Sequence, residues 1–331
     1  MPKINYYSIN EPVFSKYSRR FFIIPLKDSL HRAANRMFKV LSGNKLPFPQ
    51  NIHLELTNNC NLRCLMCPVS QSTRKTGFMD FKLFEKIVKQ CRNRFSLEKM
   101  ALMGFGEPFL HPEIIAMSKY AKEQGVRHVF TSTNATLLNA KLSEDIILRS
   151  GFDLISFSID GARKETYESI RRNASFEKVL ANIETFLEIR SKYKRSKPIA
   201  NIQILVMEET QDEIAEFVEF WKKKLKSRDI IFIRDVDTFG GQVSDHRISR
   251  QLPKIKRFPC VQLWRDFLIS WDGSVTVCCK DAHYRLCVGN VREDPIAGIW
   301  KNNKWEEIRQ THRSGNWDRI PLCRNCSEWN Q

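Results

Sequence analysis

Strand-like and helix-like patterns alternate from residue 51 onward, and this alternation restricts the fold more than any other feature of the chain. Six short apolar segments have the length and composition of strands, at 52–57, 99–103, 128–132, 154–159, 201–206 and 230–234. Amphipathic helical patterns lie between them, at about 80–95, 112–124, 175–194 and 210–226. Successive βα units predict an α/β fold with a parallel sheet and helices outside it. Right-handed crossovers would curl that sheet into a full or partial (β/α)6 barrel.

The patterns divide the chain into four regions. We expect an N-terminal basic amphipathic extension at 1–49, a core at 50–240, a linker at 241–259 and a small cysteine-rich domain at 260–331. Within the extension, residues 26–41 place apolar side chains on one helical face and basic side chains away from it. Such a helix either lies on an anionic membrane surface or packs under the main domain.

The chain is basic, with a formal net charge of +17. This charge implies an anionic partner, which could be nucleic acid, phospholipid headgroups or a phosphorylated substrate. Nucleic acid is not supported, because the sequence has no RNA-recognition or helix-turn-helix signature and its basic runs lack interleaved aromatic residues. No apolar run approaches the ~18 residues that span a bilayer, and the first residues lack the apolar core of a signal peptide. We therefore expect a cytoplasmic protein, in peripheral contact with the inner membrane face if the amphipathic helix binds lipid.

Three of the ten cysteines, Cys60, Cys64 and Cys67, form a C-x3-C-x2-C motif directly after the first predicted strand. In a reducing cytosol, clustered cysteines indicate metal binding rather than disulfides. Three thiolates on one tight loop can ligate three irons of a cubane and leave the fourth iron open to another ligand. A structural zinc site would usually need four ligands, and no nearby histidine completes the set. In a barrel, this loop would lie at the carboxyl ends of the strands, where such folds build active sites.

A second group, Cys260, Cys278, Cys323 and Cys326, lies near the end of the sequence, with Gly273 in a turn between the first two. Four thiolates suit either a fully ligated iron–sulfur cluster or a zinc ribbon, and spacing alone does not separate these alternatives. Two neighbouring cysteines, Cys279 and Cys287, could be an alternative ligand or a hydrogen-atom donor, or small packed residues. The last cysteine, Cys91, lies on a helical face and is expected in the core.

The first cysteine motif resembles the signature of the radical S-adenosylmethionine (SAM) superfamily. The resemblance implies a [4Fe–4S] cluster whose open iron binds the amino and carboxylate groups of SAM. One-electron reduction then cleaves SAM to methionine and a 5′-deoxyadenosyl radical, which abstracts hydrogen from a substrate. Met66 stands where this family usually has an aromatic residue whose backbone meets the adenine.

Three further stretches follow in the order found in that superfamily. The first, 104–108, resembles the GGEP motif and implies that Gly106 and Glu107 contact the SAM amino group. The second, 132–134, resembles the ribose-contacting segment, with Ser132 and Asn134 as candidates.

The third stretch, 156–161, resembles the fourth-strand motif, and its Ser158 would point into the barrel. Arg171 follows this motif and has two interpretations. It either pairs with the SAM carboxylate or is a solvated helix arginine.

The C-terminal pattern C-x12-G-x4-C, followed by C-x2-C, resembles the SPASM/twitch extension. It resembles the one-cluster form found in the inosamine dehydrogenase of aminoglycoside biosynthesis. The resemblance implies an auxiliary [4Fe–4S] cluster on the second cysteine group.

The expected function is hydrogen abstraction from a substrate, with the auxiliary cluster accepting an electron or binding the substrate. A sugar, cyclitol or glycan precursor, small and anionic, is the favoured substrate, and flavodoxin or ferredoxin the expected reductant. The sequence leaves dehydrogenase, epimerase and dehydratase reactions open. Modification of a ribosomal peptide is the alternative reaction, and a non-enzymatic iron–sulfur or zinc scaffold is the alternative of another class. Spacing singles out no general base among four aspartates: Asp153, Asp160, Asp235 and Asp237.

Overall fold

The computed structural model describes residues 5–6, 47–236, 238–243, 257–326 and 329. The predicted amphipathic helix at 26–41, most of the predicted linker and Asp237 lie outside the described residues. The domain boundaries therefore stay predictions. Within the described part of the chain, no helix combines the length and the apolar character needed to cross a membrane.

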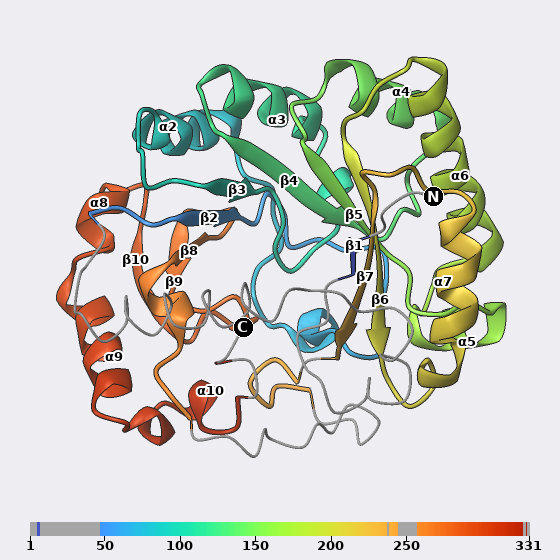
Figure 1. Ribbon diagram of the computed structural model, residues 1–331. Coiled ribbons are helices and arrows are strands. Elements are labelled where there is room, and N and C mark those ends of the chain that lie inside the picture. The colour runs from blue at the N-terminus through green and yellow to red at the C-terminus, as the bar shows by residue number, and fades with distance from the viewer. Residues whose placement is uncertain (1–4, 7–46, 237, 244–256, 327–328, 330–331) are drawn as a thin grey trace.

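One sheet forms the centre of the molecule, and the described strands follow the order β1-β7-β6-β5-β4-β3-β2-β8-β9-β10 (Figure 1). All six predicted strands are present and pair in parallel with their neighbours. They are β2 (Asn51–Leu54), β3 (Lys99–Ala101), β4 (His128–Thr133), β5 (Leu154–Ser158), β6 (Ile199–Val206) and β7 (Ile230–Asp235). The curved sheet does not close, so the prediction of a partial (β/α)6 barrel with parallel strands is confirmed.

Segments from both ends of the chain extend this sheet. A two-residue strand, β1 (Asn5–Tyr6), pairs in parallel with β7 at one edge. At the other edge β8 (Asp266–Ile269) pairs in parallel with β2, followed by the antiparallel strands β9 (Ser274–Thr276) and β10 (Cys287–Asn290). The cysteine-rich C-terminal region therefore shares a continuous sheet with the barrel.

Helices cover the outer face of the barrel strands (Figure 1). The α-helices are α2 (Phe81–Cys91), α3 (Ile114–Glu123), α4 (Ala140–Arg149), α5 (Lys164–Ile170), α6 (Phe176–Lys192) and α7 (Ile214–Lys222). Short 3-10 helices precede or interrupt them at η3 (Pro68–Gln71), η4 (Pro108–Leu110) and η5 (Gln211–Glu213). The first helix begins where its pattern predicts, because the Asp80 carboxylate accepts a hydrogen bond from the backbone N–H of Leu83 at 2.7 Å.

The two faces of the barrel sheet differ in polarity. Successive side chains of a strand point to opposite faces, so Ile52 and Leu54 of β2 are fully buried in the apolar layer under the helices. His53 points the other way and lines the interior, as does Glu55 just beyond the strand. The interior of this barrel is therefore a cavity whose wall combines charged and polar side chains with apolar ones.

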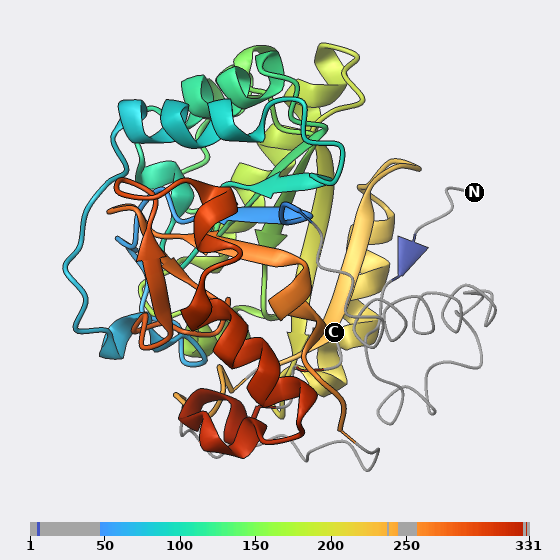
Figure 2. The same cartoon turned by 90° about the vertical axis from the view of Figure 1, so that its left-hand side faces the viewer.

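Aromatic side chains of the C-terminal region pack together and continue the hydrophobic core of the barrel. It contains η7 (Val261–Trp264), α8 (Ile296–Ile299), α9 (Asn303–Arg313), η8 (Trp317–Arg319) and α10 (Pro321–Arg324), which lie together beside β8 to β10 (Figure 2). Phe267 stacks on Trp305 with ring centroids 5.2 Å apart, and Trp300 meets Trp305 edge-on at 4.8 Å. Arg309 is 1% exposed and donates hydrogen bonds to the carbonyl oxygens of Leu263 and Trp300.

Candidate active site

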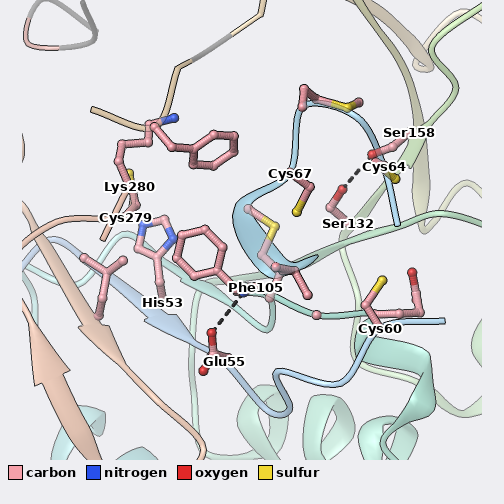
Figure 3. Close-up of a pocket in the computed structure, with 18 of the residues that line it drawn as sticks. His53, Glu55, Cys60, Cys64, Cys67, Phe105, Ser132, Ser158, Cys279 and Lys280 are labelled. Carbon is pink, nitrogen blue, oxygen red and sulfur yellow. Dashed lines mark hydrogen bonds between the residues drawn. The ribbon is translucent and has the colours of Figure 1, made fainter. Parts of the chain in front are cut away.

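A cavity of about 440 Å³ occupies the interior of the barrel. Cys60, Cys64 and Cys67 line it, and so do Cys278 and Cys279 of the C-terminal region (Figure 3). Parallel barrels place their active sites at the carboxyl ends of the strands, and the loop that follows β2 supplies the first three thiols there. One cavity therefore reaches both cysteine groups.

The first cysteine loop is held by its own backbone and by the end of α5. The Cys67 N–H donates to the Cys64 carbonyl oxygen at 3.1 Å, which closes a tight turn. The Leu65 N–H donates to the carbonyl oxygen of Ile170 at 2.9 Å. Burial raises the pKa of Cys60 and Cys64, and raises the pKa of Cys67 to about 12. As free thiols they would stay protonated, so a bound cation is what would favour the thiolate form.

The Gly-rich loop after β3 packs directly against the cysteine loop. A Cβ atom on Gly106 would lie 2.3 Å from the carbonyl oxygen of Thr57, so no other residue fits without moving the backbone. The next residue, Glu107, donates its backbone N–H to the Asn59 carbonyl oxygen at 2.8 Å. This contact fixes the position of the loop relative to the three thiols.

The Glu107 carboxylate is committed to protein donors. It is 2% exposed and accepts hydrogen bonds from the Thr133 hydroxyl at 2.7 Å and from the backbone N–H groups of Asn134 and Phe109. Burial raises the pKa of this carboxyl despite these bonds. The side chain thus joins the Gly-rich loop to the end of β4.

Two serines from neighbouring strands face the cavity together. The hydroxyl oxygens of Ser132 and Ser158 lie 3.2 Å apart, and both residues line the cavity (Figure 3). Asn134 also borders it, but its side-chain amide donates to Asn61 Oδ1 at 2.9 Å and its Oδ1 accepts from the Thr136 N–H. The Asn134 side chain therefore braces the cysteine loop against the end of β4.

Arg171 is not a solvated helix arginine, and that interpretation was wrong. Its side chain is 10% exposed and its guanidinium donates to Asp160 Oδ2 at 2.5 and 2.8 Å. Its Nη1 lies 3.8 Å from Cys64 Sγ. Burial alone would lower the pKa of Arg171, but Asp160 and Cys64 raise it, so the residue stays cationic beside the cysteine loop.

Two of the four candidate general bases, Asp160 and Asp153, form ion pairs with basic side chains. Asp160 is held by Arg171 and by the Leu205 N–H at 2.9 Å. Asp153 pairs with Lys122 and Lys197, and neither aspartate lines the cavity. The Met66 side chain is 5% exposed, belongs to a small apolar cluster and also lines the cavity.

Several cavity residues were missed by the sequence motifs. They are interior positions of strands or their ends: His53, Glu55, Lys99, Gln203, Arg234 and Asp266. The sequence signal that could have found two of them is the alternation of His53 and Glu55 with three apolar residues in 52–56.

Glu55 accepts hydrogen bonds from Arg74 at 2.5 Å and from the Phe105 N–H at 3.0 Å, and the Ser270 hydroxyl also donates to it. It thereby joins the cysteine loop, the Gly-rich loop and β8.

The second cysteine group assembles from three segments. Cys260 precedes η7, Cys278 follows β9, and Cys323 and Cys326 lie in and just after α10. Gly273 has a φ of +92° in the turn between β8 and β9, which favours glycine there. Burial and then the neighbouring Cys326 raise the pKa of Cys260, and burial raises the pKa of Cys323 to about 12. The thiols are thus close enough to influence one another.

The remaining cysteines have different surroundings. Cys279 lines the cavity and its thiol donates to Gln262 Oε1 at 3.2 Å. A hydrogen bond with Cys279 is the largest reason that the pKa of Cys278 is raised. Cys287 is exposed on β10. Cys91 is 4% exposed in the apolar core, as predicted.

The donor sets fit the iron–sulfur groups expected from the sequence. The first set offers three thiols on one loop facing a cavity, with a cationic guanidinium beside it, which leaves space for a ligand at a fourth iron. The second set offers four thiols, of which Cys278 borders that same cavity.

Two family profiles match the chain. Residues 54–221 match the Radical SAM superfamily, and residues 260–327 match SPASM, an iron–sulfur cluster-binding domain. The tungsten-containing aldehyde ferredoxin oxidoreductase cofactor-modifying protein of Pyrococcus furiosus is 26% identical over 318 residues, which cover 83% of this chain and 86% of that protein.

Solved structures show the same fold. SuiB of Streptococcus suis bound to the precursor peptide SuiA aligns with a TM-score of 0.66 and 14% identity, covering 92% of this chain and 75% of SuiB. BtrN in complex with AdoMet and 2-DOIA aligns with a TM-score of 0.57 and 20% identity, covering 86% of this chain and 94% of BtrN.

Proposed function

Since the chain belongs to the radical SAM superfamily and carries a C-terminal SPASM region, we propose that it abstracts hydrogen from a sugar, cyclitol or glycan precursor bound in the barrel cavity. Its cofactors are those of radical SAM enzymes with SPASM domains, SAM and [4Fe–4S] clusters. The observation that carries the proposal is the shared cavity, which the three thiols after β2 and the Cys278–Cys279 pair both line. A substrate bound there would lie between the two cysteine groups.

In this proposal Cys60, Cys64 and Cys67 hold the cluster that binds SAM, and the second cysteine group holds the auxiliary cluster. A reduced cluster bound there would supply the electron for cleavage of SAM to the 5′-deoxyadenosyl radical. Cys260, Cys278, Cys323 and Cys326 would ligate all irons of the second cluster.

The surrounding residues position the cofactor. Ser132 and Ser158 present two hydroxyls to the ribose side of the cavity. Arg171, whose guanidinium lies beside Cys64, would supply a positive charge for the SAM carboxylate. Backbone groups of Gly106 and Met66 would border the cofactor, while Glu107 and Asn134 would act by fixing the loops.

The cavity and the relatives support this substrate class. The interior carries several charged and polar side chains, which suit a small hydroxylated or anionic molecule better than an apolar one. The Pyrococcus relative is named for modifying a cofactor, and BtrN was solved with the ligand 2-DOIA. The reaction class, oxidation or a redox-neutral rearrangement, depends on whether the auxiliary cluster accepts an electron.

Peptide modification is the second candidate. The favouring observation is the fold alignment with SuiB, which was solved with its precursor peptide. A peptide substrate would need to extend from the cavity to the surface, whereas a cyclitol or sugar would be enclosed by it.

The test is anaerobic reconstitution with iron and sulfide, followed by reduction with dithionite or with flavodoxin in the presence of SAM. We expect about eight irons per chain from two cubanes, and release of 5′-deoxyadenosine. Protein that carries zinc alone, or a cluster that leaves SAM intact, would overturn the proposal. A cytoplasmic enzyme served by flavodoxin or ferredoxin is part of the same proposal.

A further inference from the structure

One end of the cavity lies away from the SAM residues and has a distinct chemical character. Its wall is formed by His53, Lys99, Arg265, Asp266 and Lys280, which we name the His53 chamber. We propose that the His53 chamber binds an anionic group of the substrate, a phosphate or a carboxylate. This inference rests on the proposed function and adds to it the site that recognises the substrate.

The sheet register brings the chamber residues together. Asn51 of β2 pairs with Lys99 of β3 on one side and with Asp266 of β8 on the other. His53 directly follows Ile52 in β2, so its side chain lies on the opposite face of the sheet, toward the cavity. Lys280 comes from the segment after β9, and Figure 3 shows it beside Cys279 and His53.

Positive charge exceeds negative charge in the cavity. Five of its lining residues carry a permanent or near-permanent positive charge: Lys99, Arg171, Arg234, Arg265 and Lys280. Within the described part of the chain, three carboxylates line it: Glu55, Glu107 and Asp266. Arg171 lies at the SAM end beside Cys64. Among the described residues at the other end, basic side chains outnumber carboxylates, and their positive potential would attract a bound anion.

The one carboxylate of the chamber is already neutralised. Asp266 pairs with the neighbouring Arg265 at 2.9 Å and accepts a hydrogen bond from the Asn51 amide. The pKa of Asp266 is lowered, because the hydrogen bonds and nearby positive charges outweigh the burial that by itself would raise it. It stays ionised and bound to Arg265, so it opposes the positive charges of Lys99 and Lys280 less than an unpaired carboxylate would.

His53 offers a polar group that points at such a ligand. Among the described residues, neither of its ring nitrogens has a hydrogen-bond partner, although the imidazole lines the cavity. Burial lowers the pKa of His53, and Lys99, Arg265 and Lys280 lower it further against the opposing effect of Asp266. The ring is therefore neutral near pH 7 and offers one donor and one acceptor.

The chamber lies across the cavity from the cofactor residues. Figure 3 shows His53, Lys280 and Cys279 on one side, and Ser132, Ser158 and Cys64 on the other. A substrate anchored by its anionic group in the chamber would extend toward the SAM end with its hydroxylated part. This arrangement explains why the polar interior continues beyond the residues that SAM itself would use.

The experiment measures anion binding to the anaerobically reconstituted full-length protein with SAM present, by isothermal titration calorimetry. The probes are inorganic pyrophosphate for a phosphate group and malonate for a carboxylate, and the tighter of the two identifies the source of the anion. Lys99→Gln and Lys280→Gln should each weaken binding about tenfold, as expected for loss of a charge-assisted hydrogen bond. The matched control, Lys141→Gln on the exposed face of α4, should bind both probes as the wild type does.

A second pair of variants tests the histidine. His53→Leu should weaken binding several-fold, and His53→Gln should retain most of it, because the amide keeps a donor and an acceptor. Absence of binding by both probes, or equal binding by wild type, Lys99→Gln and Lys280→Gln, would overturn the inference.

Release of 5′-deoxyadenosine in the same preparations separates this inference from the proposed function. If the protein cleaves SAM but binds neither anion, the His53 chamber is not a substrate site and the proposed function still stands. If the wild-type protein does not cleave SAM, the proposed function itself is contradicted. Variants that keep their iron and their uncoupled SAM cleavage are folded, so weaker anion binding in them reports on the chamber.

Discussion

The two cysteine groups are built in opposite ways. Cys60, Cys64 and Cys67 lie within one turn of loop, closed by the hydrogen bond from the Cys67 N–H to the Cys64 carbonyl oxygen. The second group draws on segments from Cys260 to Cys326 and depends on the packing of everything between them. All ligands of the first site come from one loop, whereas those of the second site meet only when the C-terminal region is folded.

The supports of the two groups differ in the same way. The first loop is tied by backbone bonds to the end of α5 and by Glu107 to the end of β4. The second relies on α9, whose His312 accepts the Cys260 N–H at 3.3 Å and whose Arg309 holds the backbone of η7. We therefore expect damage to the C-terminal region to remove one cluster and spare the other.

Replacing Cys60, Cys64 and Cys67 together with Ala should have the largest effect. SAM cleavage should fall below detection because no cluster remains to deliver the electron, and iron should drop from about eight to about four per chain. Iron analysis and chromatography of 5′-deoxyadenosine check both values. A triple variant that still cleaves SAM would refute the assignment of these ligands.

Replacing Cys323 and Cys326 with Ala should remove the auxiliary cluster and leave the first cluster in place. Iron should again fall to about four per chain, but uncoupled SAM cleavage should persist because the first loop does not depend on α10. Turnover of a substrate, once identified, should be lost. Loss of SAM cleavage in this variant would show that the two sites fold as one unit.

Arg309→Met should destabilise the C-terminal region by about 2–3 kcal/mol, since two buried carbonyl oxygens lose their donor. Iron of the auxiliary cluster should be lost at lower denaturant concentration than iron of the first cluster, as followed by absorbance in anaerobic urea titrations. Lys304→Met, on the exposed side of the same helix, is the control and should leave both clusters at wild-type stability. If both clusters of Arg309→Met are lost at the same urea concentration, the two sites do not unfold independently.

Asn61→Ala should have a smaller effect at the first site. It removes the hydrogen bonds that Asn61 makes with Asn134 and Thr136, at a cost of about 1–2 kcal/mol. Equilibrium dialysis of SAM should show weaker binding with unchanged iron content, while the exposed Thr73→Ala on the same segment should bind SAM normally. Unchanged SAM affinity in Asn61→Ala would exclude a positioning role for this brace.

Cys91→Ala and Cys287→Ala should have the smallest effects and serve as reference substitutions. The buried Cys91 loses a small packed group, worth about 1 kcal/mol, and the exposed Cys287 should change stability by less than about 0.5 kcal/mol. Both variants should keep about eight irons. A loss of iron in Cys287→Ala would make that thiol a ligand of the auxiliary cluster.

The sequence by itself determined the order of the βα units, the local cysteine loop and the C-terminal cysteine pattern. The βα order and the cysteine loop are local features, because hydrophobic period, turn residues and short spacing specify them without knowledge of distant contacts. The positive φ of Gly273 and the cap at Asp80 belong to the same class.

Only the tertiary structure decided how distant segments meet. The pairing of β8 with β2 and the burial of Arg171 against Asp160 join residues that no sequence pattern links. The His53 chamber depends on the register between β2, β3 and β8, and a slip of one residue would turn His53 away from the cavity. Side-chain neighbours across a sheet are set by strand order and register, which long-range packing selects, so the cavity could not be predicted from local pattern.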